Sequence, residues 1–222
     1  CLDDYLKSGF FAALDTVKTV APNTKINAVG YCIGGTLLSI GAAALAREDD
    51  DILNTITLLA AQVDFTEPGE IKRFLGASQL AFLDSMMWTD GYLQAASMGN
   101  AFKALRAEDM IINPAIERYY LGKETKPNEL MAWNADGTRM PASMHSRYLK
   151  ELFMENKLSS CKFIVDGKPV ALQDIRTPFF VIGTSTDHVA PWKSVYKIQH
   201  LCRSEVTFLL TTGGHNAGIV CG

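Results

Sequence analysis

The six residues Gly30-Tyr31-Cys32-Ile33-Gly34-Gly35 constrain the fold more than any other feature of the sequence. They follow a predicted strand, Lys25–Val29, and precede a predicted helix, Thr36–Arg47. A Gly-x-Cys-x-Gly turn in that context is typical of a nucleophile elbow, with cysteine in the place of serine. We expect the glycines at 30 and 34 to be required because strand and helix cross closely there. The Cys32 thiol would stand at a helix N-terminus, which favours thiolate, and the Ile33 N–H would face a developing oxyanion.

The pattern of the remaining sequence predicts an α/β protein with a mostly parallel sheet. The other expected elements are a helix over Asp3–Val20, strands over Ile52–Ala61, Pro178–Ile182 and Val206–Leu210, a type I′ hairpin over Lys162–Leu172, and a helix over Pro191–Leu201. Between about residues 66 and 160 the periodicity is helical and shows no clear strand, with a long helix from Glu67 through Trp88 and another over Pro141–Asn156. We expect this block to be a helical cap inserted into one catalytic domain that spans residues 1–222.

A nucleophile elbow needs an acid and a histidine later in the chain. Asp187 follows one predicted strand and His215 follows another, so both would lie in loops at the same edge of a parallel sheet as Cys32. We expect His215 to take the thiol proton, and Asp187 to orient the ring and balance its charge.

Two further residues near this edge leave alternatives open. Asp64 closes the preceding strand and is a rival to Asp187 as the acid, or else an N-cap for the helix that follows. We favour Asp187. His188, next to Asp187, is a candidate second base or a polar wall of the site, and we favour the wall.

Composition excludes several classes of function. The net charge is −3 and the pI is about 5.8, so the chain has no polycationic footprint for nucleic acid. No apolar run reaches the roughly 18 residues of a membrane helix. Five cysteines, an odd number, indicate reduced thiols and a cytoplasmic setting. No Cys or His cluster has metal-ligand spacing, so we expect neither a metal nor a separate cofactor.

A cysteine nucleophile also indicates the reaction. Cysteine forms a thioester intermediate, which keeps the acyl group reactive enough for an alcohol to attack it. A Cys elbow therefore suits acyl transfer from a thioester donor to a hydroxyl acceptor, although cysteine hydrolases with the same elbow exist. A transferase must also exclude water, and the helical insertion is a candidate cover.

The chain resembles the polyhydroxyalkanoate synthases, which polymerise 3-hydroxyacyl-CoA. The matching segments, in family order, are Gly30 to Thr36, Leu105-Arg106, Trp133 to Asp136, the hairpin after Cys161, Asp187-His188-Val189-Ala190-Pro191-Trp192, and Gly214 to Gly218. The segment from Asp187 to Trp192 is the most specific of these. The chain departs from the family after Arg106, where Ala107 to Ile112 replaces a segment that usually contains Trp.

The resemblance implies an α/β-hydrolase fold and an acyltransferase in which Cys32 carries the growing chain, His215 is the base and Asp187 its partner. It implies a homodimer that acts on polymer granules in the cytoplasm, with coenzyme A entering only as part of the substrate. Arg106 would lie near the substrate entrance, as a contact to a CoA phosphate or as a solvated cation.

The resemblance also implies that the strands which precede the elbow strand in this fold are missing. One oxyanion-hole N–H normally comes from that part, and a parallel-sheet edge would be exposed. We therefore expect the 222-residue chain alone to be weakly active or inactive.

Two other functions remain open from the sequence. The first is a cysteine hydrolase that resembles dienelactone hydrolases or acts as an acyl-CoA thioesterase, although the long separation of Cys32 from Asp187 argues against a compact hydrolase. The second is a non-catalytic granule-associated homologue, against which the ordered retention of Cys32, Asp187 and His215 speaks.

Overall fold

The computed structural model describes residues 1–105, 107–123 and 128–220, and the chain divides into two compact units. The first unit comprises Cys1–Gly76 and Arg147–Gly222, and the second comprises Ala77–Ser146. The insertion expected at residues 66–160 therefore contains the whole second unit together with residues of the first.

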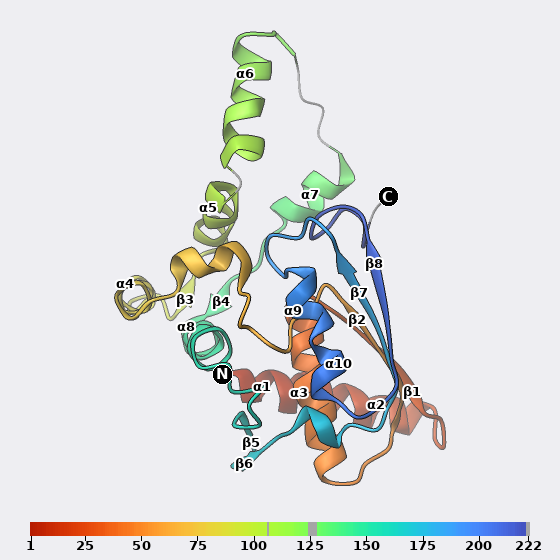
Figure 1. Cartoon of the computed structure of the whole chain (residues 1–222). Coiled ribbons are helices and arrows are strands. Elements are labelled where there is room, and N and C mark those ends of the chain that lie inside the picture. Colours follow the sequence, from red (N-terminus) through yellow and green to blue (C-terminus); the bar gives the residue numbers. More distant parts are fainter. Residues whose placement is uncertain (106, 124–127, 221–222) are drawn as a thin grey trace. The chain divides into compact units, whose positions relative to one another are not determined.

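A four-stranded parallel sheet forms the centre of the first unit (Figure 1). Its strands, in spatial order, are β1 (Ile26–Tyr31), β2 (Leu53–Leu59), β7 (Phe179–Thr184) and β8 (Val206–Thr211). All three pairings are parallel, so the carboxyl ends of the four strands lie at one edge. The α/β fold expected from the sequence is confirmed.

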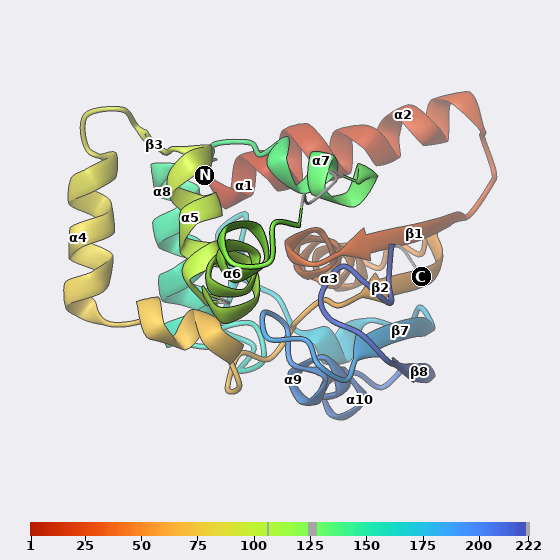
Figure 2. The ribbon, with the colours of Figure 1, turned by 90° about the horizontal axis from the view of Figure 1, so that it is seen from above.

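One face of this sheet is covered by helices (Figures 1 and 2). Helix α3 (Ile33–Arg47) packs on β1 and β2, while α9 (Trp192–Tyr196) and α10 (Ile198–Leu201) lie beside β7 on the same side. The side chains that face them are apolar and inaccessible to solvent; Ile56, Leu58 and Val181 are all 0% exposed. The expected helix over Pro191–Leu201 is thus two short helices that meet at Lys197.

The N-terminal helical stretch packs against α3. It comprises α1 (Leu2–Asp4), a π-helical segment (Tyr5–Phe11) and α2 (Ala12–Val20). Together these three segments cover the helix predicted over Asp3–Val20. A Cβ added to Gly41 of α3 would lie 2.4 Å from Cε1 of Phe10. Glycine at position 41 therefore allows the two helical stretches to approach closely.

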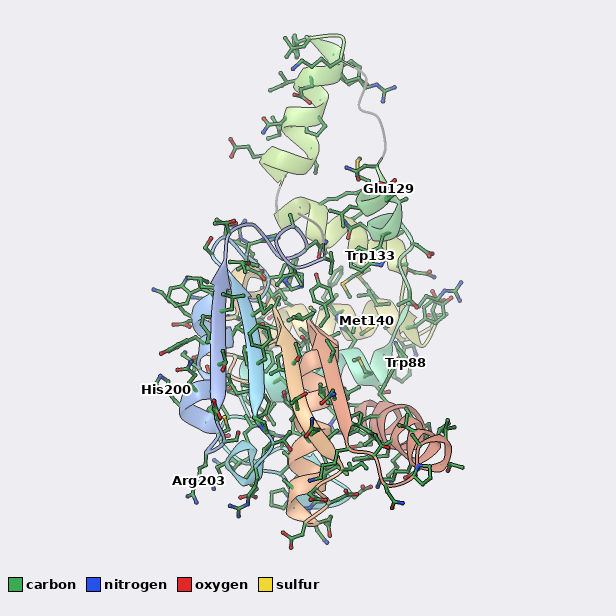
Figure 3. The ribbon with its side chains drawn as sticks, turned by 90° about the vertical axis from the view of Figure 1, so that its right-hand side faces the viewer. Trp88, Glu129, Trp133, Met140, His200 and Arg203 are labelled. Carbon is green, nitrogen blue, oxygen red and sulfur yellow. The ribbon has the colours of Figure 1, made fainter. Side chains whose placement is uncertain are left out.

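The opposite face of the sheet, which is turned toward the viewer in Figure 3, carries apolar side chains that are open to solvent. Val29 of β1 is 65% exposed, and Phe180 of β7 and Leu209 of β8 are also exposed. Among the described strands, β1 pairs with β2 alone, so its other edge has no strand beside it.

The predicted hairpin forms as β5 (Ile164–Val165) and β6 (Lys168–Pro169). Asp166 and Gly167 have φ values of 51° and 75°, as both central residues of a type I′ turn must. The Arg47 guanidinium, at the end of α3, donates to the main-chain oxygens of Val165 and Lys168 at 3.2 and 3.1 Å. The hairpin is thereby tied to the C-terminal end of that helix.

The second unit is mostly helical but contains a small strand pair. Its helices are α4 (Ala77–Met87), α5 (Ala95–Leu105), a π-helical segment (Glu108–Ile112), α6 (Asn113–Tyr119), α7 (Glu129–Ala135) and α8 (Ala142–Arg147, whose last residue belongs to the first unit). Strands β3 (Tyr92–Leu93) and β4 (Met140–Pro141) pair antiparallel, so the expectation of no strand in this block was wrong. Each has only two residues, too few to produce a period-2 pattern in the sequence.

Two of the predicted helices in and around this unit are divided. The stretch from Glu67 through Trp88 is a 3₁₀-helix (Gly69–Phe74) followed by α4, because Leu75 adopts an extended conformation between them. The helix expected over Pro141–Asn156 is α8 followed by a π-helical segment, Tyr148–Met154. Across the described ranges, no helix combines the length and the apolar character that a bilayer span requires.

Candidate active site

Cys32 occupies a strained turn between β1 and α3. Its φ and ψ are 53° and −127°, a conformation that costs a non-glycine residue free energy and that requires support from its surroundings. The support includes the Cys32 N–H, which donates to the Leu59 oxygen of the neighbouring strand at 2.9 Å. Strand β1 extends to Tyr31 and α3 begins at Ile33, so the turn is a single residue, tighter than the expected Gly30–Gly35.

The glycines beside Cys32 explain how strand and helix approach. A Cβ on Gly30 would lie 2.4 Å from Cα of Gly35, and a Cβ on Gly35 would lie 2.4 Å from the Ala61 Cβ. The space around Gly34 is open within 4 Å. The steric requirement expected at positions 30 and 34 therefore applies at 30 and 35, and the expectation for Gly34 was wrong.

Ile33 is the first residue of α3. The N–H groups of the first helical turn have no acceptor within their own helix and carry the positive end of the helix dipole. The Ile33 N–H next to the thiol therefore has the chemical character of an oxyanion donor. Its role stays a prediction.

His215 and Asp187 meet in the loops after β8 and β7. The distance from His215 Nδ1 to Asp187 Oδ2 is 2.7 Å, and the Asp187 side chain is 0% exposed. Because an ionised carboxylate only accepts, Nδ1 is the protonated ring nitrogen of this pair. The other Asp187 oxygen accepts the N–H groups of Val189 and Ala190, each at 2.8 Å, so the loop's own backbone fixes the carboxylate.

The His215 ring also interacts with Cys32 and is strongly basic. Burial disfavours the charged ring, but hydrogen bonds to the Asp187 carboxylate and to Cys32, together with the electrostatic influence of both groups, outweigh burial and raise the pKa of His215 to about 10. The structure thus brings together the three residues that the sequence placed in separate loops. In this environment a proton on the imidazole is stabilised next to the sulfur.

Two tyrosines that sequence reasoning did not single out complete the surroundings of the thiol. The Tyr31 hydroxyl shares its single proton between Asn216 Oδ1 and the main-chain oxygen of His215, the latter at 3.0 Å. Burial and the neighbouring Cys32 raise the pKa of Tyr148. No sequence pattern could have found Tyr148; Tyr31 stands next to Cys32, but the reach of its hydroxyl cannot be read from spacing.

The rival acid Asp64 lies in a different polar cluster. Its carboxylate accepts from the Thr66 N–H at 3.0 Å, from Asn156 Nδ2 at 3.1 Å and from Lys197 Nζ at 3.3 Å. Burial opposes the charged carboxylate, but the hydrogen bonds with Thr66 and Asn156 and the charge of Lys197 outweigh it and lower the pKa of Asp64. The contact with Thr66 is a local Asx-type turn. The helix that follows, Gly69–Phe74, has Pro68 at its N-cap and no side-chain cap, so the alternative of Asp64 as its N-cap was wrong.

The remaining predicted site residues stand as follows. His188 is half-buried in the Asp187 loop, and its main-chain oxygen accepts the Glu70 N–H at 2.8 Å. A Cβ on Gly69 would lie 2.3 Å from that oxygen, so glycine is required there. Arg106 lies outside the described residues. Within the part of the chain that is described, no group of three or more His, Cys, Asp or Glu residues could hold a metal ion.

Residues 9–220 match the family described as alpha/beta hydrolase fold, and the chain belongs to that family. A monoacylglycerol lipase from Paleococcus ferrophilus shares the fold, with a TM-score of 0.55 and 12% identity over 96% of this chain and 66% of the lipase. At that identity the likeness concerns the fold alone.

More specific similarity connects the chain with polymerases. It is 38% identical over 216 residues to the poly(3-hydroxyalkanoate) polymerase subunit PhaC of Rhizobium meliloti, and 40% identical over 216 residues to that of Rhizobium etli. The resemblance to polyhydroxyalkanoate synthases inferred from the sequence is confirmed. These alignments cover 97% of this chain but only 35% and 34% of the two relatives.

Proposed function

We propose that the protein to which this sequence belongs polymerises (R)-3-hydroxyacyl-CoA into polyhydroxyalkanoate with release of coenzyme A, through an acyl thioester on Cys32. The observation that carries the proposal is the pairing of His215 with both Cys32 and Asp187 in a chain related to named polymerases. His215 acts as the acid and base of the cycle, Asp187 orients its ring, and the Ile33 N–H is one donor to the oxyanion.

The first half of the cycle transfers the acyl group to the enzyme. The Cys32 thiolate attacks the thioester carbonyl carbon and forms a tetrahedral intermediate whose oxyanion faces the Ile33 N–H. The bond from carbon to the coenzyme A sulfur then breaks, and the protonated His215 ring gives its proton to the departing thiolate. A ring with a pKa of about 10 supports this order, because it already carries the required proton at neutral pH.

The second half transfers the acyl group to a hydroxyl. Neutral His215 accepts the proton from the 3-hydroxyl of another hydroxyacyl unit, and the oxygen of that unit attacks the acyl-Cys32 carbonyl. An ester bond forms, the carbon–sulfur bond breaks, and Cys32 leaves as a thiolate beside the newly charged imidazole. Asp187 stabilises that charge in both halves.

We also propose that the natural protein acts as a homodimer at polymer granules in the cytoplasm, with 3-hydroxyacyl-CoA as its substrate and no further cofactor. Relatives named as polymerases support the substrate class. Arg106 as a contact to a CoA phosphate and His188 as a polar wall belong to the same proposal.

Product analysis tests the reaction. The natural full-length protein that contains this sequence is incubated with 3-hydroxybutyryl-CoA, and the products are separated into free hydroxy acid and oligomer. Oligomer and coenzyme A, both lost in Cys32→Ala, support the polymerase. Free 3-hydroxybutyrate alone would establish the cysteine hydrolase instead, and no consumption of substrate would favour the non-catalytic homologue.

A further inference from the structure

We infer that Tyr31 is a positioning residue for His215. Its hydroxyl holds the main chain of the loop after β8 that contains His215, here called the base loop, against the strand that precedes Cys32. This inference rests on the proposed function of the Cys32–His215 pair. It adds to that function a residue outside the nucleophile, base and acid, and it explains how two distant segments are held at a reactive separation.

The first observation is the position of the Tyr31 hydroxyl between two acceptors of the loop after β8. Its single proton is shared between the His215 main-chain oxygen, 3.0 Å away, and Asn216 Oδ1. These contacts join residues 184 and 185 positions apart in the sequence. They hold the backbone of the histidine itself, whereas Asp187 holds its ring.

The second observation is that the Tyr31 ring packs on the imidazole. The ring centroids of Tyr31 and His215 are 5.4 Å apart, with an interplanar angle of 32°. A tyrosine in this arrangement limits the tilt of the imidazole while its hydroxyl limits the position of the main chain. Both constraints act on the residue that must face the Cys32 sulfur.

The third observation concerns the base loop, which needs external constraint. His215 lies between Gly213 and Gly218, whose φ values are 100° and 94°. Strand β8 ends at Thr211, before this loop begins. Thr186 holds the near end, with its hydroxyl 2.6 Å from the Gly213 oxygen. Tyr31 supplies the corresponding restraint at His215 and Asn216.

The fourth observation is that the main chain of Tyr31 is itself held in place by the sheet. It is the last residue of β1 and is paired with Leu59 of β2. The contact of Gly30 with Gly35 fixes the crossing of strand and helix on one side of it, and Cys32 follows directly on the other. Tyr31 and Cys32 are consecutive residues. A restraint that Tyr31 places on His215 therefore also fixes the position of the imidazole relative to the Cys32 sulfur.

The test compares Tyr31→Phe with Tyr196→Phe in the natural full-length protein. Tyr196 also packs on a histidine, with its ring centroid 5.7 Å from that of His200, but it lies on α9 and its ring also packs on Phe208 within β8. For each variant, alkylation of Cys32 by iodoacetamide is followed by peptide mass spectrometry from pH 5 to 11, and acylation by 3-hydroxybutyryl-CoA is followed as coenzyme A release.

We expect Tyr31→Phe to slow acylation roughly 10-fold or more through kcat with little change in KM, because small displacements of a reacting group cost large factors in rate. The pH profile of Cys32 alkylation should shift, since the displaced imidazole no longer pairs fully with the thiol. Tyr196→Phe should match the wild type in rate and in pH profile.

The inference is overturned if Tyr31→Phe retains the wild-type rate and pH profile, or if both variants change equally. Alkylation needs no acyl substrate, so its pH profile tests the positioning role even if the protein consumes no hydroxyacyl-CoA. A loss of unfolding free energy with an unchanged pH profile would assign Tyr31 a purely structural role and would also contradict the inference.

Discussion

The loops after β2 and β7 each place an aspartate at the same edge of the sheet, yet the two carboxylates have different partners. Asp187 contacts a histidine and the backbone of its own loop. Asp64 contacts a lysine, an asparagine and a threonine. Strand order makes both positions eligible for the acid of an elbow enzyme, and the contacts distinguish them. The Asp187 carboxylate is therefore placed against a titratable ring, whereas the Asp64 loop fastens β2 to α9.

The fastening role of the Asp64 loop extends to its neighbours. Gln62 Nε2 donates to Ser194 Oγ at 3.0 Å, and Ser194 in turn donates to the Asp64 main-chain oxygen. Lys197 follows on the same helical stretch. This network connects the end of β2 to the helix that directly follows the Asp187 loop. The comparison therefore favours Asp187 as the acid of the proposed mechanism and a supporting role for Asp64.

The largest expected difference is in catalysis. Asp187→Asn should slow acylation of Cys32 by about 10³- to 10⁴-fold, with substrate binding largely retained. The imidazole loses the negative charge that stabilises its protonated form and the acceptor that fixes its tautomer. Asp64→Asn should change the rate no more than a few-fold. Release of coenzyme A in the first turnover measures both. An unchanged rate in Asp187→Asn, together with a large loss in Asp64→Asn, would reverse the assignment.

The next difference is in stability. Asp64→Ala should lower the free energy of unfolding by about 1–3 kcal/mol, because donors on Thr66, Asn156 and Lys197 lose a partly buried charged acceptor. Urea denaturation measures the change. Asp51→Ala is the matched control, since Asp51 pairs with Lys25 at the exposed surface and should contribute little. Equal losses in the two variants would contradict the fastening role.

The two loops should also respond to pH in opposite directions. The pKa of His215 is raised from 6.5 to about 10, so its contribution to stability is complete below about pH 6.5 and is lost as the pH rises through 10. The pKa of Asp64 is lowered, so its contribution is present above the ordinary carboxylate pKa and is lost as the pH falls through the lowered value. The physical reason is that each ring or carboxylate is stabilised in its charged form.

Denaturation across the pH range, in the wild type and in His215→Gln and Asp64→Ala, separates these contributions. The difference between wild type and His215→Gln should shrink on the alkaline side. The difference between wild type and Asp64→Ala should shrink on the acid side. A difference that stays constant with pH would show that the corresponding group is not stabilised in its charged form.

The smallest expected effect concerns the periphery of the Asp187 loop. Thr184 Oγ1 lies 3.5 Å from Asp187 Oδ2, at the limit of a hydrogen bond, while two backbone N–H groups hold the same carboxylate at 2.8 Å. Thr184→Val should therefore cost no more than about 1 kcal/mol in unfolding free energy and leave acylation within a few-fold of wild type. A loss as large as that of Asp187→Asn would mean that Thr184, rather than the loop backbone, fixes the acid.

The sequence predicted the elements of the site better than its contacts. The strand–turn–helix around Cys32 and the two later strands before Asp187 and His215 follow from apolar patterning, and their common edge follows from parallel topology. The close contact falls at Gly35 and not at Gly34, because the rotation of α3 about its own axis decides which of the two glycines faces its neighbours. The hydroxyl of Tyr31 reaches a loop at the other end of the chain, which no local pattern encodes.

The choice between Asp187 and Asp64 illustrates the same limit. Order along the chain left both residues open, because both follow strands of the same sheet. Their side-chain partners come from segments far away in sequence, Lys197 for Asp64 and His215 for Asp187. The break at Leu75, which divides a predicted helix, is likewise decided by a backbone conformation that the apolar periodicity does not reveal.

The most direct measurement is the mass of the natural full-length protein after brief exposure to 3-hydroxybutyryl-CoA, followed by peptide mapping. The account predicts one hydroxybutyryl group on the peptide that contains Cys32, present in Cys161→Ala and absent in Cys32→Ala, with its appearance strongly slowed in Asp187→Asn. An acyl group on another residue, or polymer formed by Cys32→Ala, would contradict it.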